Sequence, residues 1–191
     1  MIERDCFTIT WQARLSWPRI LPQTLHPDLQ RILQRFERAY CFVSLMNITM
    51  DTGVPTFLAV GRGRSAPLVV AAATSLDPFE AARKVLEELA HTHTYCQYLR
   101  NEEPRLVPER TYKNIVTQRD HLNFWQDPAH QSFADFLTAS NQTQDFHSLA
   151  NLSSGDPRRD LQILISRIGS AGNRVLLNDL TTTDVRGRSS S

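Results

Sequence analysis

The first forty residues place hydrophobic side chains at the spacing of two amphipathic helices. One helix is predicted over residues 2–15, and Pro18 would stop it. A second is predicted over residues 28–39, after a loop that contains prolines. The apolar positions are Ile2, Cys6, Ile9 and Ala13 in the first helix, and Leu29, Ile32, Leu33 and Phe36 in the second.

Three strand-like apolar segments follow, at residues 40–50, 54–60 and 68–74. The first is apolar on both faces, which is typical of a central strand. Short turns at residues 51–53 and 61–67 join them. Because connections this short join antiparallel neighbours, the pattern predicts an antiparallel meander with flanking helices, an α/β (α+β) fold.

A long helix is predicted to begin after the third strand. Asp77 has the character of an N-cap, Pro78 suits the first helical position, and Glu80 suits the acid of a capping box. One face of this helix is apolar and is expected to pack on the sheet. It comprises Ala81, Ala82, Val85, Leu86, Leu89, Thr92, Cys96 and Leu99.

Beyond residue 102 the chain is polar and rich in loops. Short helices are predicted near residues 120–127 and 131–139, followed by a polar linker. A further helix is predicted over residues 157–168, and a last strand over residues 174–180.

The long helix carries two acid–base pairs that are one residue out of step. At about 100° per residue, Arg83 and Glu87 fall opposite the apolar face, whereas Lys84 and Glu88, with His91, line its border. A pair on the back of a helix is solvated and contributes little, but a border pair can lean into a cleft and hold phosphate or a metal ion. Helix geometry leaves both interpretations open, and it favours the border pair as the candidate site.

Other local patterns predict ordinary structure. His91 and His93 project about 200° apart on a helix, so they cannot share one metal ion. The glycine-rich residues 61–65 lack the spacing of a phosphate-binding loop and are predicted to form a hairpin turn.

Composition excludes several partners and compartments. A formal net charge of +1 gives no case for nucleic acid or an anionic membrane. No apolar run approaches the roughly 20 residues of a membrane span, and the charged N-terminus is unlike a signal peptide. The three scattered cysteines are expected to be free thiols, so the sequence predicts a cytoplasmic protein.

Several phrases, in their order and spacing, resemble the YcaO-domain family, and its thiazole/oxazole-forming peptide cyclodehydratases in particular. The phrases are "IERDCFTITWQARLSWPRI", "NITMDTGVPTFLAVG", "SLDPFEAARKVLEELAHTHTY", "QRDHLNFWQDPAHQSFADFL" and "VLLNDLTTTDV". The resemblance implies a partial YcaO domain over residues 1–191, with a core at 1–102 that carries a wall of the nucleotide site and a subgroup-specific part at 103–191.

The family's chemistry implies ATP and Mg²⁺ as cofactors. A Cys, Ser or Thr side chain of a precursor peptide attacks the preceding carbonyl, ATP phosphorylates the resulting oxygen, and loss of phosphate gives a thiazoline or oxazoline. Catalysis of this kind depends on positioning and on neutralisation of charge. The same ATP chemistry with another nucleophile, giving thioamides or amidines, stays an alternative.

The resemblance also implies site residues. The family's Glu-Arg of the "ERD" segment falls on Glu3 and Arg4, with Arg4 expected near the nucleotide phosphates. Its helical basic residue, Glu and Gln fall on Lys84, Glu88 and His91, with Glu88 as the metal ligand. Lys stands where Arg is usual and His where Gln is usual, so the bidentate fork of an arginine is lost. The other register, Arg83 with Glu87, stays open.

The family's upstream acidic motifs and its proline-rich C-terminus have no counterpart here, so the resemblance leads us to expect a copy incomplete at both ends. Expected partners are a precursor peptide, an E1-like protein that binds the leader peptide, a flavin-dependent azoline dehydrogenase and a second copy in a homodimer. The alternative function is a catalytically inactive YcaO remnant that serves as a dimerisation or peptide-binding scaffold.

Overall fold

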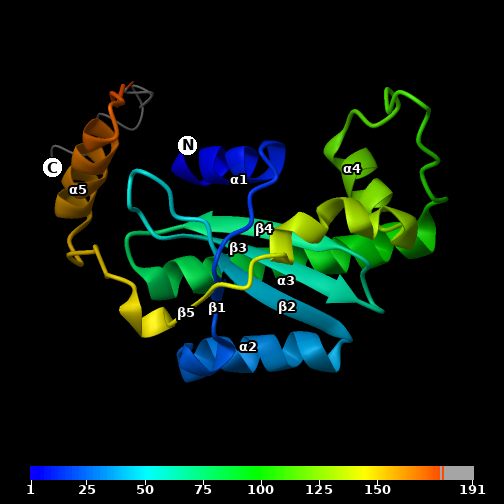
Figure 1. The fold of residues 1–191 in the computed structure, drawn as a ribbon, viewed down its shortest axis with the longest axis horizontal. Helices are drawn as coiled ribbons and strands as arrows, with labels where there is room; N and C mark the ends of the chain where they lie inside the picture. Colours follow the sequence, from blue (N-terminus) through cyan, green and yellow to red (C-terminus); the bar gives the residue numbers. More distant parts are fainter. Residues whose placement is uncertain (177, 179–191) are drawn as a thin grey trace, which may run out of the picture.

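The computed structural model describes residues 1–176 and 178, which form a mixed α/β fold (Figure 1). Its elements in chain order are α1 (Ile2–Gln12), β1 (Arg19–Ile20), η1 (Pro22–Thr24), α2 (Pro27–Arg38), β2 (Cys41–Asn47), β3 (Thr56–Gly63), β4 (Val69–Thr74), α3 (Pro78–Glu102), α4 (Gln118–Trp125), η2 (Pro128–Thr138), β5 (Thr143–Gln144), η3 (Phe146–Ser148) and α5 (Pro157–Ser170), where η denotes a 3-10 helix.

The predicted meander forms the main part of a five-stranded sheet with the order β4-β3-β2-β1-β5. The strands β2, β3 and β4 follow one another in the chain, and each is antiparallel to the next. In the middle strand, Ala59 lies opposite Leu45 of β2 and opposite Ala71 of β4. The strands β1 and β5 were not predicted; β1 is antiparallel to β2 and parallel to β5. Each has only two residues, too few to show an alternating pattern.

Helices cover both faces of the sheet, so the hydrophobic core has two parts, one on each face of the sheet. The helices α2 and α3 pack on one face, and α1 packs on the other with η2 (Figure 1). The predicted apolar face of α3 is buried apart from Thr92, which is half-buried. His93, which was not predicted to belong to this face, is buried as well. The ion pair between Arg62 and Asp135 (2.6 Å) joins β3 to η2.

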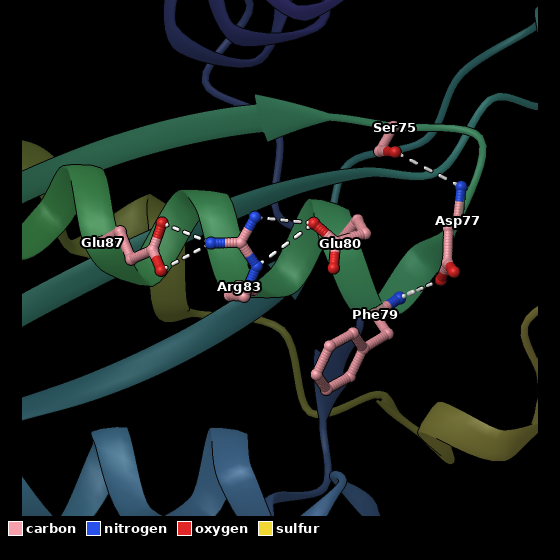
Figure 2. Close-up of polar contacts among 6 residues, drawn as sticks. All are labelled: Ser75, Asp77, Phe79, Glu80, Arg83 and Glu87. Carbon is pink, nitrogen blue, oxygen red and sulfur yellow. Dashed lines mark hydrogen bonds and ion pairs between the residues drawn. The ribbon is translucent and has the colours of Figure 1, made fainter. Parts of the chain in front are cut away.

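One predicted helix boundary and one predicted capping interaction need correction. The helix α1 ends at Gln12, before the predicted residue 15, because Arg14 adopts the left-handed conformation (φ 51°). At the start of α3, the Asp77 carboxylate accepts from the Phe79 N–H (2.8 Å), as an N-cap should. Glu80, however, forms no capping box: the Asp77 N–H donates to Ser75 Oγ (3.3 Å), and Glu80 pairs with Arg83 instead (Figure 2).

The glycine-rich segment connects β3 to β4 by a turn, as predicted, and the close approach of its backbone to Tyr40 requires a glycine at position 63. A Cβ atom on Gly63 would lie 2.1 Å from the carbonyl oxygen of Tyr40, so no larger residue fits there without a shift of the backbone.

The downstream half agrees with the sequence in its helices and differs in its strands. The predicted helix at 131–139 is the 3-10 helix η2, and the predicted linker contains β5 and η3. Residues 174–176 are not in a strand, and most of the rest of the predicted last strand lies outside the described residues. The helix α5 buries none of its residues and stands beside the layers (Figure 1). Among the described residues, no helix is both long and apolar enough to cross a membrane.

Candidate functional site

A cavity of about 840 Å³ runs along β4 between α1 and α3, and α4 with the loop before it closes the far side. Its lining comprises Glu3, Arg4, Phe7 and Trp11 of α1, Val70, Ala71 and Ala72 of β4, Glu88 and Thr92 of α3, Tyr112 and Ile115 of the loop, and Gln118, His121, Leu122, Phe124 and Trp125 of α4. Its size is typical of a ligand-binding pocket.

The helix α1 points its charged first turn into this cavity. Cys6 and Thr10 are buried against the sheet, so the ridge of Glu3, Phe7 and Trp11, at positions i, i+4 and i+8, faces the cavity. The Glu3 carboxylate accepts a hydrogen bond from the Thr74 N–H (3.2 Å), which attaches α1 to the end of β4. Helix periodicity therefore explains why Glu3 and the neighbouring Arg4 reach the same space.

Glu88 brings a second carboxylate to the cavity from α3. The residue as a whole is exposed, but partial desolvation of its carboxylate raises its pKa above the ordinary value; the nearby Glu3 carboxylate raises it further, and His91 acts in the opposite direction. Two carboxylates that line one cavity form a place where a cation would be stabilised.

The border pair does not act as a pair here. Lys84 is exposed and does not line the cavity, although its register partner Glu88 does. His91 is exposed and also lies outside the lining. Ligand roles for Lys84 and His91 therefore stay predictions.

The alternative pair is held within its own helix. Arg83 donates to Glu87 (2.6 and 2.8 Å) and to Glu80 (2.7 and 3.1 Å), so its guanidinium lies between two carboxylates one turn apart on either side (Figure 2). The pKa of Glu80 is lowered by the hydrogen bond from Arg83, with Lys84 as a minor cause. Arg83 and Glu87 do not line the cavity, and this arrangement is that of a solvated helix pair.

The two histidines of α3 occupy different environments, in line with the prediction that they do not share an ion. His91 is exposed, whereas His93 is buried and its Nε2 lies 2.9 Å from Ser65 Oγ. Burial lowers the pKa of His93, and the charge of Arg100 lowers it further. Within the described part of the chain, no three His, Cys, Asp or Glu side chains come together as a metal-binding group.

Sequence reasoning missed the aromatic wall of the cavity. Trp11 contacts Phe7 (ring centroids 5.8 Å apart) and Trp125 (5.3 Å), and Phe124 contacts Trp125 (5.0 Å) and Tyr112 (6.0 Å). The shared ridge of Glu3 and Trp11 on α1 was readable from the sequence. Contact with the aromatic residues of α4 was not, because it depends on a tertiary fold across more than a hundred residues.

His121 was also missed as a cavity residue. It falls at the start of the short helix that the sequence predicts near residues 120–127, and nothing local marked it as a site residue. Asp120 completes a capping box with Thr117 at the start of α4, and the next residue, His121, lines the cavity.

The sequence that forms this fold and its carboxylate-bearing cavity matches a known protein family. The model of the YcaO cyclodehydratases, described as ATP- and Mg²⁺-binding, matches residues 1–189. The chain therefore belongs to the YcaO family. No protein of curated function matches it.

Solved structures share the fold at low sequence identity. The heterocyclase TruD superposes with a TM-score of 0.68 at 16% identity, covering 90% of this chain and 22% of TruD. YcaO from Methanopyrus kandleri, bound with AMPPCP and Mg²⁺, gives 0.64 at 19% identity, with 90% and 42% covered. The E. coli microcin synthetase McbBCD complex with pro-MccB17 bound gives 0.57 at 14% identity, with 84% and 41% covered. The chain thus spans between 22% and 42% of the length of these matched chains.

Proposed function

We propose that this chain takes part in ATP-dependent cyclodehydration of a precursor peptide, and that Glu3, Arg4 and Glu88 form one wall of its Mg²⁺–ATP site. The observation that carries the proposal is the convergence of two carboxylates and one guanidinium, from two different helices, on one cavity of about 840 Å³. The reaction would close a Cys, Ser or Thr side chain onto the preceding carbonyl to give a thiazoline or oxazoline.

The residues fit the proposed group. Mg²⁺ in nucleotide sites is commonly held by one or two carboxylates together with phosphate oxygens and water, which is the number that Glu3 and Glu88 supply. The guanidinium of Arg4 suits phosphate oxygens. ATP would supply the phosphate that turns the oxygen of the peptide carbonyl into a leaving group. A complete Mg²⁺–ATP site would need further charged groups, since among the described residues only three Asp, Glu, Arg or Lys side chains line the cavity: Glu3, Arg4 and Glu88.

A binding measurement tests the site. We expect AMPPCP and Mg²⁺ to shift the amide NMR signals of residues that line the cavity, with a Kd of about 1 mM or weaker for this chain alone. Glu88→Ala should weaken the Mg²⁺-dependent binding by about tenfold or more. The matched control is Glu87→Ala, one residue away on the solvated side of α3, and it should bind as the parent does. Equal losses in the two variants would refute the assignment of Glu88.

The partners in this proposal are a precursor peptide and partner proteins. The McbBCD complex with pro-MccB17 bound supports this as an assembly that contains the same fold. The E1-like protein, the azoline dehydrogenase, the homodimer and the cytoplasmic location stay expectations from the family resemblance.

A non-catalytic scaffold is the second candidate, and one observation favours it: the described residues provide no group of three metal-binding side chains. Mass spectrometry of a precursor peptide incubated with ATP, Mg²⁺ and the partner proteins separates the two functions. Loss of one water per ring formed, abolished by Glu88→Ala and retained in Glu87→Ala, supports the enzyme. Peptide binding without loss of water supports the scaffold.

A further inference from the structure

Within residues 1–176 and 178, one edge of the strand β4 has no paired strand, and this edge forms the floor of the cavity. Among the described strands β4 pairs only with β3, at the end of the sheet. Val70, Ala71 and Ala72 line the cavity, with α1 on one side of the strand and α3 on the other. The edge is therefore enclosed between two helices.

The hydrogen-bond pattern shows which backbone groups face outward. The Ser75 N–H donates to the Pro55 carbonyl (3.1 Å), so residues 69, 71, 73 and 75 direct their backbone groups toward β3. The alternate residues Val70, Ala72 and Thr74 must direct theirs away from it. The bond from the Thr74 N–H to the Glu3 carboxylate agrees with this assignment and shows that the edge accepts a partner at its charged end.

The geometry along this edge is that of a site for an added strand. Val70 and Ala72 present N–H and C=O groups in pairs about 7 Å apart, the repeat of an extended peptide. An extended chain beside them would direct its side chains alternately toward the α1 wall, with Trp11, and the α3 wall, with Thr92. A nucleotide cannot satisfy such a row of alternating donors and acceptors, whereas a peptide backbone can.

From this geometry we infer that the precursor peptide binds as an additional strand along the edge of β4. The inference rests on the proposed function only for the identity of the peptide. The strand ends where Glu3 occupies the Thr74 N–H, so the peptide residue that leaves the edge there enters the space between Glu3, Arg4 and Glu88. The row of backbone hydrogen bonds thus delivers a peptide carbonyl to the charged end of the cavity, and the aromatic wall receives side chains farther along.

Hydrogen exchange tests the inference directly. The probe is the peptide acetyl-Thr-Val-Cys-Val-Thr-amide, added without nucleotide to the whole ¹⁵N-labelled chain. Exchange of the Val70 and Ala72 amides should slow by about tenfold at saturation, because both become hydrogen-bonded. Two further peptides carry N-methyl groups at alternate amides, one at the odd positions and one at the even positions. The peptide whose methyl groups replace the N–H donors that face β4 should give no protection, whereas the other should still protect.

A variant of the strand gives a second measurement. Ala72→Pro removes an outward donor without removing a bond to β3, and proline is tolerated in edge strands when its missing N–H faces away from the sheet. It should fold and bind the probe about tenfold more weakly, whereas the control Ala72→Ser, which keeps the N–H, should bind normally. If Ala72→Pro fails to fold, the methylated peptides still decide the question.

Three results would overturn the inference: equal protection by both methylated peptides, protection confined to another surface, or Val70 and Ala72 amides already protected in a longer YcaO protein without peptide. The last would show that a strand of the longer protein occupies the edge. Binding of AMPPCP that depends on Glu88, with no response of β4 to the peptide, would overturn this inference and leave the proposed function intact. Protection of β4 by the peptide without nucleotide binding that depends on Glu88 would overturn the proposed nucleotide site and leave this inference intact.

Discussion

The carboxylate of Glu3 and the backbone N–H of Thr74, 71 positions apart in the sequence, form a hydrogen bond of 3.2 Å. This bond holds the first turn of α1 against the end of β4 and keeps one negative charge on the side of the cavity opposite α3. Glu88 experiences that charge, which is the second cause of its raised pKa after burial. The electrostatics of the cavity therefore depend on where an N-terminal helix meets an edge strand.

Neutralising Glu3 should lower the pKa of Glu88. Glu3→Gln removes the charge while its amide oxygen can still accept from Thr74, so the pKa of Glu88 should move down toward its ordinary value of 4.5 and remain above it because of burial. NMR titration of the Glu88 side-chain carboxyl carbon measures the shift. In the control Glu87→Gln the pKa of Glu88 should stay where it is in the parent. A Glu88 pKa that does not change in Glu3→Gln would contradict the coupling across the cavity.

Arg83 and Lys84 should differ in what their removal affects. Arg83→Ala breaks two helix pairs and should lower the Tm by about 1–2 °C, with nucleotide binding unchanged. Lys84→Ala, at an exposed position with no ion pair among the described residues, should leave the Tm unchanged and weaken nucleotide binding, as the family register predicts. Thermal unfolding and AMPPCP titration of both variants test this. A loss of nucleotide affinity in Arg83→Ala alone would show that the register is the other one.

The helices and the meander could be predicted because their hydrophobic repeats are local. The apolar face of α3 and the continuous apolar run of β4 both appear within short windows of sequence, and the cap at Asp77 is a local signal too. The strands β1 and β5 could not be predicted, since two residues carry no period and the pairing of Arg19 with Thr143 joins distant segments.

The site could be predicted only in part, for a similar reason. Helix counting placed Glu88 at the border of the apolar face, and the structure has it lining the cavity. The same counting placed Lys84 beside it, one turn nearer the start of α3, where the cavity does not reach. Border position is a property of the helix alone, but the extent of a cavity depends on α1 and α4, whose positions no local pattern reports.

Acidification should destabilise the fold through His93. Because burial lowers its pKa, the folded state resists protonation, and below the ordinary value of 6.5 the unfolded state binds more protons. Stability should therefore be fully present above about pH 6.5 and fall as the pH decreases from there toward the folded pKa. His93→Gln, which can still bond to Ser65, should reduce this slope, whereas the exposed control His91→Gln should keep it. Urea unfolding between pH 5 and 8 gives the slopes, and identical slopes in the parent and His93→Gln would exclude His93 as the cause.

The three cysteine thiols should be unreactive in the folded protein. Cys6, Cys41 and Cys96 are buried and free, and burial raises the pKa of Cys41 to about 11 and of Cys96 to about 12, with that of Cys6 raised as well. Since the thiolate is the reactive form, labelling by an aromatic disulfide reagent at pH 8 should require opening of the fold. We expect almost no labelling in native buffer and three equivalents in denaturant. The variant Cys6→Ser identifies the labelling signal of Cys6. This thiol reports on α1, the helix that carries Glu3. We expect all three thiols to be labelled slowly and at one rate, because a single cooperative core must open before any of them can react. Rapid native labelling that disappears in Cys6→Ser would contradict this expectation, because it would show that α1 detaches from the sheet without global unfolding.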